Sequence, residues 1–174
     1  MRSARVLLAV CAAVALAGVL TGLAGADSKR VVASANGGSV WDIENMFGLE
    51  LIEVQPFTFT ARVFEDGSVA GSYLYRTVDD GVPFFASGPL TCAVIAADRG
   101  WFGGTIESSS EPSLEGLDMW FQVQDNGEGA GAPPDMSTLI GAGGPGTAQE
   151  YCDEAPPVRF PFLIEAGNIQ IRSG

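Results

Sequence analysis

The stretch that decides the fold is Phe57-Thr58-Phe59-Thr60-Ala61-Arg62-Val63, in which apolar and polar residues alternate strictly. Because successive side chains of a β-strand point to opposite faces, this alternation predicts a half-buried strand. The pair Asp66-Gly67 follows, and such a pair between two alternating runs is a strong hairpin signal because the turn needs positive φ angles. The partner strand of the predicted hairpin covers residues 69–76.

The same alternation continues towards the C-terminus. Further strands are predicted at residues 84–97, 101–108, 117–124, 158–165 and 168–172. Proline cannot donate to a strand ladder, so Gly88-Pro89 predicts an irregularity within the first of these strands. The pair Gly103-Gly104 indicates a bend or a close approach of another backbone.

Three segments outside these strands give weaker patterns. Residues 39–47 fit a strand or a short helical turn, residues 27–34 fit a mobile terminus, and residues 136–140 fit a short strand. No segment has the spacing of an amphipathic helix. We therefore expect an all-β fold: an antiparallel up-and-down barrel of about eight strands, with a two-sheet β-sandwich as the alternative. Closure into a barrel would remove the exposed strand edges.

The first 26 residues have the features of an export signal. Arg2 and Arg5 precede an apolar run from Val6 to Leu23, and Ala24-Gly25-Ala26 offers small residues for a signal peptidase. We predict cleavage after Ala26, a secreted or extracytoplasmic protein, and a single domain over residues 27–174. The alternative is that the segment is retained as a membrane anchor, since about 18–20 apolar residues suffice to span a bilayer. With cleavage, no membrane span is expected in the mature chain.

The charge of the chain narrows the classes of function. The 174 residues include 9 basic and 21 acidic side chains, no histidine, and a net charge of −12. Cleavage would remove two arginines and no acid, so −12 would become −14. This acidity excludes nucleic acid as an expected partner, because binding to its backbone relies on Lys and Arg. The absence of histidine excludes Ser-His-Asp triads and imidazole metal sites.

Two cysteines, Cys92 and Cys152, remain after the predicted cleavage. An exported chain with two cysteines most simply forms one disulfide bond between them, and two buried thiols are the alternative. The bond would tie residues 126–157, a Gly/Pro-rich excursion, to the strand that carries Cys92.

The start of this excursion holds candidate metal ligands. Asp125, Glu128 and Asp135 lie among glycines and prolines, and oxygen-rich loops of this kind can bind calcium. The spacing does not match an EF-hand loop, and an ordinary turn between two strands explains the same residues. No cofactor is expected.

Aromatic residues on the predicted strands are the second set of candidates. On a closed barrel they would either line a cavity for a small apolar ligand or fill the core. The cavity candidates are Phe57, Phe59, Tyr73, Tyr75, Trp101 and Phe121.

Several segments together resemble a group of small exported bacterial proteins of β-barrel type. The segments that carry the resemblance are residues 57–61, 66–71, 91–92, 103–106 and 123–135, together with Gly88. The resemblance covers roughly residues 57–171 and implies export and a barrel-like fold. It implies no activity, because none is assigned to that group. The turn at residues 97–101 departs from the asparagine-containing turn of the group.

No motif indicates a reaction, so we expect a non-enzymatic protein that binds a small apolar ligand or a surface partner. A barrel enzyme of the lyase or isomerase type is one alternative, since such enzymes need few catalytic side chains. A structural module of the cell envelope is the other. The oligomeric state is left open by the sequence.

Overall fold

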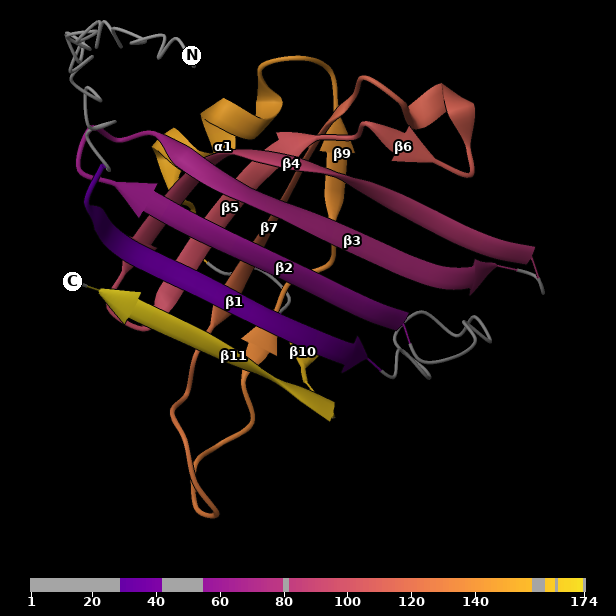
Figure 1. Cartoon of the computed structure of the whole chain (residues 1–174). Helices are drawn as coiled ribbons and strands as arrows, with labels where there is room; N and C mark the ends of the chain where they lie inside the picture. The colour runs from indigo at the N-terminus through magenta and orange to yellow at the C-terminus, as the bar shows by residue number, and fades with distance from the viewer. Residues whose placement is uncertain (1–28, 42–54, 80–81, 158–161, 165, 174) are drawn as a thin grey trace, which may run out of the picture.

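A computed structural model describes residues 29–41, 55–79, 82–157, 162–164 and 166–173. The described strands form one antiparallel sheet that curls into a half-barrel (Figure 1). The pairing order along the sheet is β10-β8-β7-β5-β4-β3-β2-β1-β11, with β6 paired to β4 and β9 paired to β7. The all-β, up-and-down prediction is therefore confirmed, because β1 to β5 pair in sequence order.

The long strands lie in the first two thirds of the chain, and the short elements follow. The strands are β1 (Val31–Trp41), β2 (Gln55–Phe64), β3 (Val69–Asp79), β4 (Val82–Ala96), β5 (Arg99–Thr105), β6 (Ser108–Ser109), β7 (Asp118–Gln124), β8 (Met136–Ser137), β9 (Gly141–Gly143), β10 (Phe162–Leu163) and β11 (Ala166–Ser173). A short 3-10 helix, η1 (Pro112–Leu114), follows β6, and one α-helix, α1 (Thr147–Glu154), follows β9.

The predicted hairpin is β2 and β3, and its register pairs Thr60 with Ser72. The Asp66 carboxylate accepts bonds from the Ser68 backbone N–H at 3.0 Å and from the Ser68 hydroxyl at 2.6 Å. Gly67 has a φ of 80°, a conformation that favours glycine. The turn chemistry in the sequence thus fixes which residues of the two strands face each other.

Strand β4 belongs to both halves of the half-barrel. It pairs with β3 as far as Pro89 and with β5 from Leu90 onwards. The register shifts between Leu90 and Cys92. The change of partner follows the proline, which cannot donate a ladder bond. The irregularity predicted at Gly88-Pro89 is the place where the strand passes from one half to the other.

The core lies between these two halves, with β11, β1, β2 and β3 in front and β5 and β7 behind in Figure 1. Apolar side chains from both halves meet there. The buried members are Ala35, Phe57, Phe59, Ala61, Tyr73, Ala86, Leu90, Phe102, Ile106, Met119, Phe121, Val123, Phe162, Ile164 and Ile169.

Helix α1 covers the outer face of the β5–β7 half. Its buried residues Ala148 and Cys152 face the sheet, and Cys152 forms the predicted disulfide with Cys92. Gly103 lies beneath the helix, where an added methyl group would sit 2.8 Å from the Ala148 carbonyl oxygen. The close backbone approach predicted for Gly103-Gly104 is thus a helix packed against the sheet.

Residues from β7 fix the start and one side of α1. The Asp118 carboxylate accepts bonds from the backbone N–H groups of Gly146 and Ala148 at 2.7 and 3.1 Å. The negative charge of Asp118 lies near the N-terminus of α1, where it interacts favourably with the positive end of the helix dipole. The rings of Trp120 and Tyr151 lie 6.0 Å apart between the strand and the helix.

Three expectations from the sequence need correction. The absence of a helix was wrong, because α1 occupies Thr147–Glu154. Residues 31–34 belong to β1 rather than to a mobile terminus, and β1 includes 39–41, whereas 42–47 lie outside the described residues. The predicted strand at 136–140 is shorter, since β8 covers Met136–Ser137 only. Among the described helices, none is long and apolar enough to cross a membrane.

Candidate functional site

Three of the aromatic candidates pack together in the core. Phe57, Phe59 and Phe121 are at most 3% exposed, and their ring centroids lie 4.6 to 5.7 Å apart. Phe102, which was not among the candidates, stacks on Phe121 at 5.1 Å. These edge-to-face and stacked contacts are typical of a packed aromatic core. The four phenyl rings contact one another directly, so they pack as part of the core.

The two tyrosines lie on the same inner face. Tyr73 is 3% exposed, and its hydroxyl donates to the Thr105 carbonyl oxygen at 3.5 Å. Burial, with a smaller contribution from the nearby Glu107, raises the pKa of the Tyr73 phenol, which therefore stays protonated. Tyr75 is half-buried, and its ring lies 6.0 Å from that of Phe84.

Trp101 lies apart from the other aromatic candidates. Its neighbour Phe102 points into the core, so Trp101 points to the outer face of β5. The indole N–H donates to the Pro156 carbonyl oxygen at 2.8 Å. Trp101 therefore belongs to the packing of the segment after α1, and the structure does not bring it to the Phe57 cluster.

The acidic loop candidates bind the backbone of the last strand. Asp135 is buried, and its two oxygens accept bonds from the N–H groups of Asn126 and Ile169 at 2.8 and 2.7 Å. Asp125 accepts in the same way from Gly127 and Ile171, both at 2.8 Å. The N–H groups of Ile169 and Ile171, on the edge of β11 that pairs with no strand in the described sheet, thus donate to carboxylates of the loop after β7.

Glu128 extends these contacts to side chains of β11. One of its oxygens accepts from the side-chain amides of Asn168 and Gln170 at 3.0 and 3.1 Å. These hydrogen bonds, Asn168 first, hold the pKa of Glu128 below its ordinary value. Within the described ranges, no group of three or more potential ligand side chains could hold a metal ion. The described residues therefore give no support to the calcium interpretation.

This loop also explains how the half-barrel closes. Strand β11 ends the pairing order on one side, while β7 and β8 belong to the other half of the sheet. Asp125 and Asp135 flank the loop between β7 and β8 and reach across to β11. We call Asp125, Glu128 and Asp135 the carboxylate clasp. The sheet therefore does not close into a full barrel through strand pairing. It forms a half-barrel, and hydrogen bonds between these carboxylates and the backbone of β11 hold its two sides together.

The outer face of β11, β1, β2 and β3 is not covered by another described element (Figure 1). Register pairs each outward side chain with outward neighbours. Arg172, Ser34, Arg62 and Ala70 form one row across the four strands, and Gln170, Asn36, Thr60 and Ser72 form the next. We call these two rows the polar face.

Small side chains leave a depression in the polar face. Its volume is about 520 Å³, and it is lined by Ser34, Ala35, Asn36, Thr60, Ala61, Arg62, Ala70 and Gly71. Ser34 is paired with Arg62 on one side and with Arg172 on the other. Strands lie about 4.8 Å apart, so the Cα atoms of the two arginines are roughly 10 Å apart, one on each side of Ser34.

Within the described part of the chain, neither arginine forms an ion pair with a carboxylate. The ion pairs of the described residues join Lys29 to Asp66 and Arg30 to Glu65, at the turn between β2 and β3. Arg172 donates to the Gln170 side-chain oxygen at 3.3 Å. Glu128, outside the face, accepts a bond from Gln170 at 3.1 Å, and Arg172 makes a minor contribution to the lowered pKa of Glu128. No Asp or Glu stands among the eight residues of the polar face.

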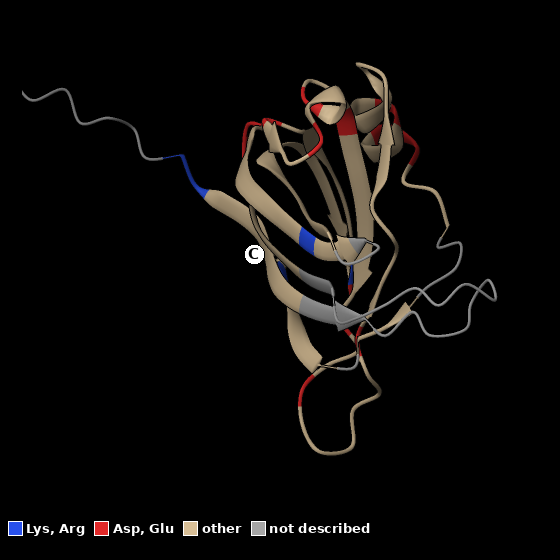
Figure 2. Cartoon of the chain, turned by 90° about the vertical axis from the view of Figure 1, so that its right-hand side faces the viewer, with Lys and Arg blue, Asp and Glu red and all other residues tan. Residues whose placement is uncertain are grey.

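Among the described residues, acidic and basic side chains are distributed differently. Figure 2 shows acidic residues in the loops and the helix at one end of the sheet and in the loop at the other end. Basic residues lie on the strands and near the start of β1. The polar face carries positive charge on a chain whose net charge is −12.

The sequence analysis did not single out the polar face. Alternation places Arg62 and Ser72 on the polar side of their strands, and this could be read from the sequence. The pairing of Arg172 with Ser34, which brings the two ends of the chain together, could not. No local pattern predicts a pairing between residues so far apart in sequence.

Comparisons with protein-family models, curated proteins and solved structures found no match to this chain.

Proposed function

We propose that this chain is an exported, non-enzymatic binding protein whose polar face holds an anionic carbohydrate polymer. The observation that carries the proposal is the pair Arg62 and Arg172, which flank Ser34 in a row of the polar face that contains no Asp or Glu. The chain as a whole has a net charge of −12, whereas this face is positively charged, so an anionic ligand is attracted to this face.

The side chains between the arginines fit a carbohydrate. Ser34, Asn36, Thr60 and Ser72 offer hydroxyl and amide groups that both donate and accept hydrogen bonds. A guanidinium group recognises a carboxylate through two parallel hydrogen bonds. A polymer of sugars that carry carboxylates presents both kinds of group at regular spacing.

Long-range repulsion does not prevent this binding. The Debye length at physiological ionic strength is about 8 Å, so the acidic ends of the sheet are largely screened from the polar face. At low ionic strength the same acidic ends repel the polymer and leave the polar face as its docking site.

Export supports the same proposal. The Cys92–Cys152 disulfide suits an oxidising compartment, and residues 1–26 have the pattern of a cleaved signal. An exported protein meets the anionic polymers of cell surfaces. The N-terminal sequence of the mature protein, expected to begin at Asp27, checks this part separately.

The test is binding to polygalacturonate, with neutral dextran as the uncharged control polymer. The double variant Arg62→Gln, Arg172→Gln should bind polygalacturonate roughly tenfold more weakly, because each exposed charge-assisted contact contributes about 0.5–1 kcal/mol. Arg99→Gln is the matched control, since Arg99 is exposed at the start of β5 outside the polar face. Equal binding of both polymers, or equal loss in the control, would refute the proposal.

A further inference from the structure

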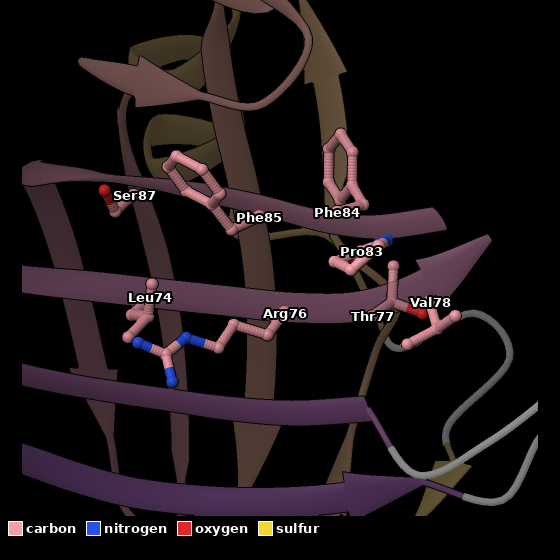
Figure 3. A pocket seen from close by; sticks show the side chains of 8 residues that line it. All are labelled: Leu74, Arg76, Thr77, Val78, Pro83, Phe84, Phe85 and Ser87. Carbon is pink, nitrogen blue, oxygen red and sulfur yellow. The ribbon is translucent and has the colours of Figure 1, made fainter. Parts of the chain in front are cut away.

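A second hollow lies at the far end of the uncovered sheet, on the β3–β4 hairpin. Its volume is about 610 Å³, and its lining residues are Leu74, Arg76, Thr77, Val78, Pro83, Phe84, Phe85 and Ser87 (Figure 3). Leu74 pairs with Ser87, Arg76 with Phe85, and Val78 with Pro83. These six residues alternate along two neighbouring strands, so they share one face of the sheet. We call this hollow the hairpin groove.

The hairpin groove is mostly apolar, unlike the polar face. Phe85 is 38% exposed, and Leu74 and Val78 on β3 are partly exposed beside it. Large apolar side chains on a protein surface mark binding sites when they are grouped. Here the grouping is confined to the hairpin, because the rows that contain Ser34 and Asn36 are polar.

Arg76 brings one positive charge into these apolar surroundings. It is exposed, it lies between Leu74 and Val78 along β3, and it faces Phe85 on β4. The ion pairs of the described residues do not include Arg76. In Figure 3 its side chain extends along β3 on the same side of the sheet as Leu74. A cation with apolar neighbours complements a ligand that joins a negative charge to a hydrocarbon chain.

We propose that the hairpin groove binds a single-chain amphiphile with a carboxylate head. The head binds the Arg76 guanidinium, and the hydrocarbon chain lies against Leu74, Val78 and Phe85. This site goes beyond the polymer site proposed above, because it takes a different ligand and Arg76 lies four residues along β3 from Ser72, the polar-face residue nearest to it on that strand, roughly 13 Å away. Either site can fail without the other.

The size of the groove selects this class of ligand. Small-molecule sites usually have volumes of about 300–1,000 Å³, and the groove lies within that range. Leu74 and Val78 are four residues apart, so the apolar wall extends for roughly 13 Å along β3. That length accommodates a medium hydrocarbon chain beside the Arg76 head site.

The test uses titration calorimetry with three probes of equal chain length at concentrations below micelle formation. The probes are decanoate, decanol and decyltrimethylammonium. Decanoate should bind at least tenfold more tightly than the other two. Amide chemical shifts in residues 74–87 should change in the decanoate complex, while those of residues 34–36 should not.

Two variants separate the charge from the apolar wall. Arg76→Gln should weaken decanoate binding at least tenfold and leave the weak decanol binding unchanged, whereas Phe85→Ser should weaken both. Arg99→Gln is the matched control, an exposed arginine on β5 of the same sheet, and should bind decanoate like the parent protein. Arg76 is exposed, so its variant should keep the parent melting temperature even if Phe85→Ser does not.

Three results would overturn the proposal. One is the absence of decanoate binding to the parent protein, including the case in which only anionic phospholipid vesicles bind. Another is equal affinity for all three probes, which would mean that the cation plays no part. The third is a folded Arg76→Gln variant that binds decanoate unchanged.

Discussion

The outer surface of the sheet is built differently on its two halves. On the β5–β7 half, outward positions hold Trp101, Gly103 and Trp120, and helix α1 and the segment after it cover them. On the β11–β3 half, outward positions hold hydroxyl, amide and guanidinium groups that remain open to solvent. The inner faces of both halves carry the same kind of apolar residue. The two halves of the sheet therefore share an apolar inner face, but their outer faces differ: one is covered by packed residues, and the other is polar and open to solvent.

The difference separates stability from binding. A covered surface contributes contacts that hold the fold, so changes there should lower the free energy of unfolding. An open polar surface contributes few such contacts, so changes there should affect binding and leave stability nearly unchanged. Substitutions matched between the two halves test this separation.

The largest effect is expected from the disulfide that fastens α1 to the covered half. In the chain-entropy model, a bond across a sequence separation of 60 stabilises the protein by about 4 kcal/mol. The double variant Cys92→Ala, Cys152→Ala removes the bond without leaving a free thiol. Urea unfolding monitored by tryptophan fluorescence measures the loss. A loss below about 1 kcal/mol would mean that α1 stays docked without the bond.

The carboxylate clasp, where the two halves meet, should give the next largest effect. Asp135→Ala leaves the buried N–H group of Ile169 and the half-buried N–H group of Asn126 without their acceptor, which should cost about 2–3 kcal/mol. Hydrogen exchange at the Ile169 amide should speed up in the same variant.

Asp153→Ala is the matched control for the clasp. Asp153 lies on α1 and accepts only an exposed side-chain bond from Gln149 at 2.8 Å. Its loss should change stability by less than about 0.5 kcal/mol. Equal effects of the two variants would mean that the clasp does not hold β11.

Two glycines compare the covered and open surfaces directly. A methyl group at Gly103 would lie 2.7 Å from Cys92 Sγ and 2.8 Å from the Ala148 carbonyl, so Gly103→Ala should cost about 1–3 kcal/mol. At Gly38 the nearest atoms are 3.5 Å away, an ordinary contact. Gly38→Ala should therefore be neutral or stabilise by about 0.5 kcal/mol. Thermal unfolding of both variants decides whether the helix lies directly on β5.

Local patterns in the sequence predicted one part of the fold well. The β2–β3 hairpin followed from strict alternation and Asp66-Gly67, because both signals act between near neighbours. The break at Pro89 followed from a missing donor, and the Cys92–Cys152 bond followed from the cysteine count. Each of these depends on a chemical property of one or two residues.

The parts that were missed depend on residues far apart in sequence. Helix α1 has eight residues, and the buried residues in it, Ala148 and Cys152, are a single pair at four-residue spacing. Its start is fixed by Asp118, 28 residues earlier. The clasp pairs Asp135 with Ile169, 34 residues later, so its carboxylates resembled metal ligands when the loop was considered alone.

The covered half also contains one feature that opposes stability, and it gives the smallest predicted effect. Gln122 is 1% exposed, and neither its side-chain nitrogen nor its oxygen has a hydrogen-bond partner among the described residues. It pairs with Trp101 on β5 and points to the outer face, opposite the core residues Phe121 and Val123. A buried amide without partners is destabilising, and an apolar side chain of similar volume removes that cost. Gln122→Met should therefore raise the free energy of unfolding by about 1 kcal/mol, measured by urea titration.

Gln124→Met is the control. Gln124 lies on the same face of β7, but its amide donates to Asn126 at 2.9 Å and to Asp98 at 3.3 Å, so its loss should not stabilise the protein. If Gln122→Met destabilises instead, a water molecule or another partner satisfies the amide in solution, and the covered half is fully hydrogen-bonded after all.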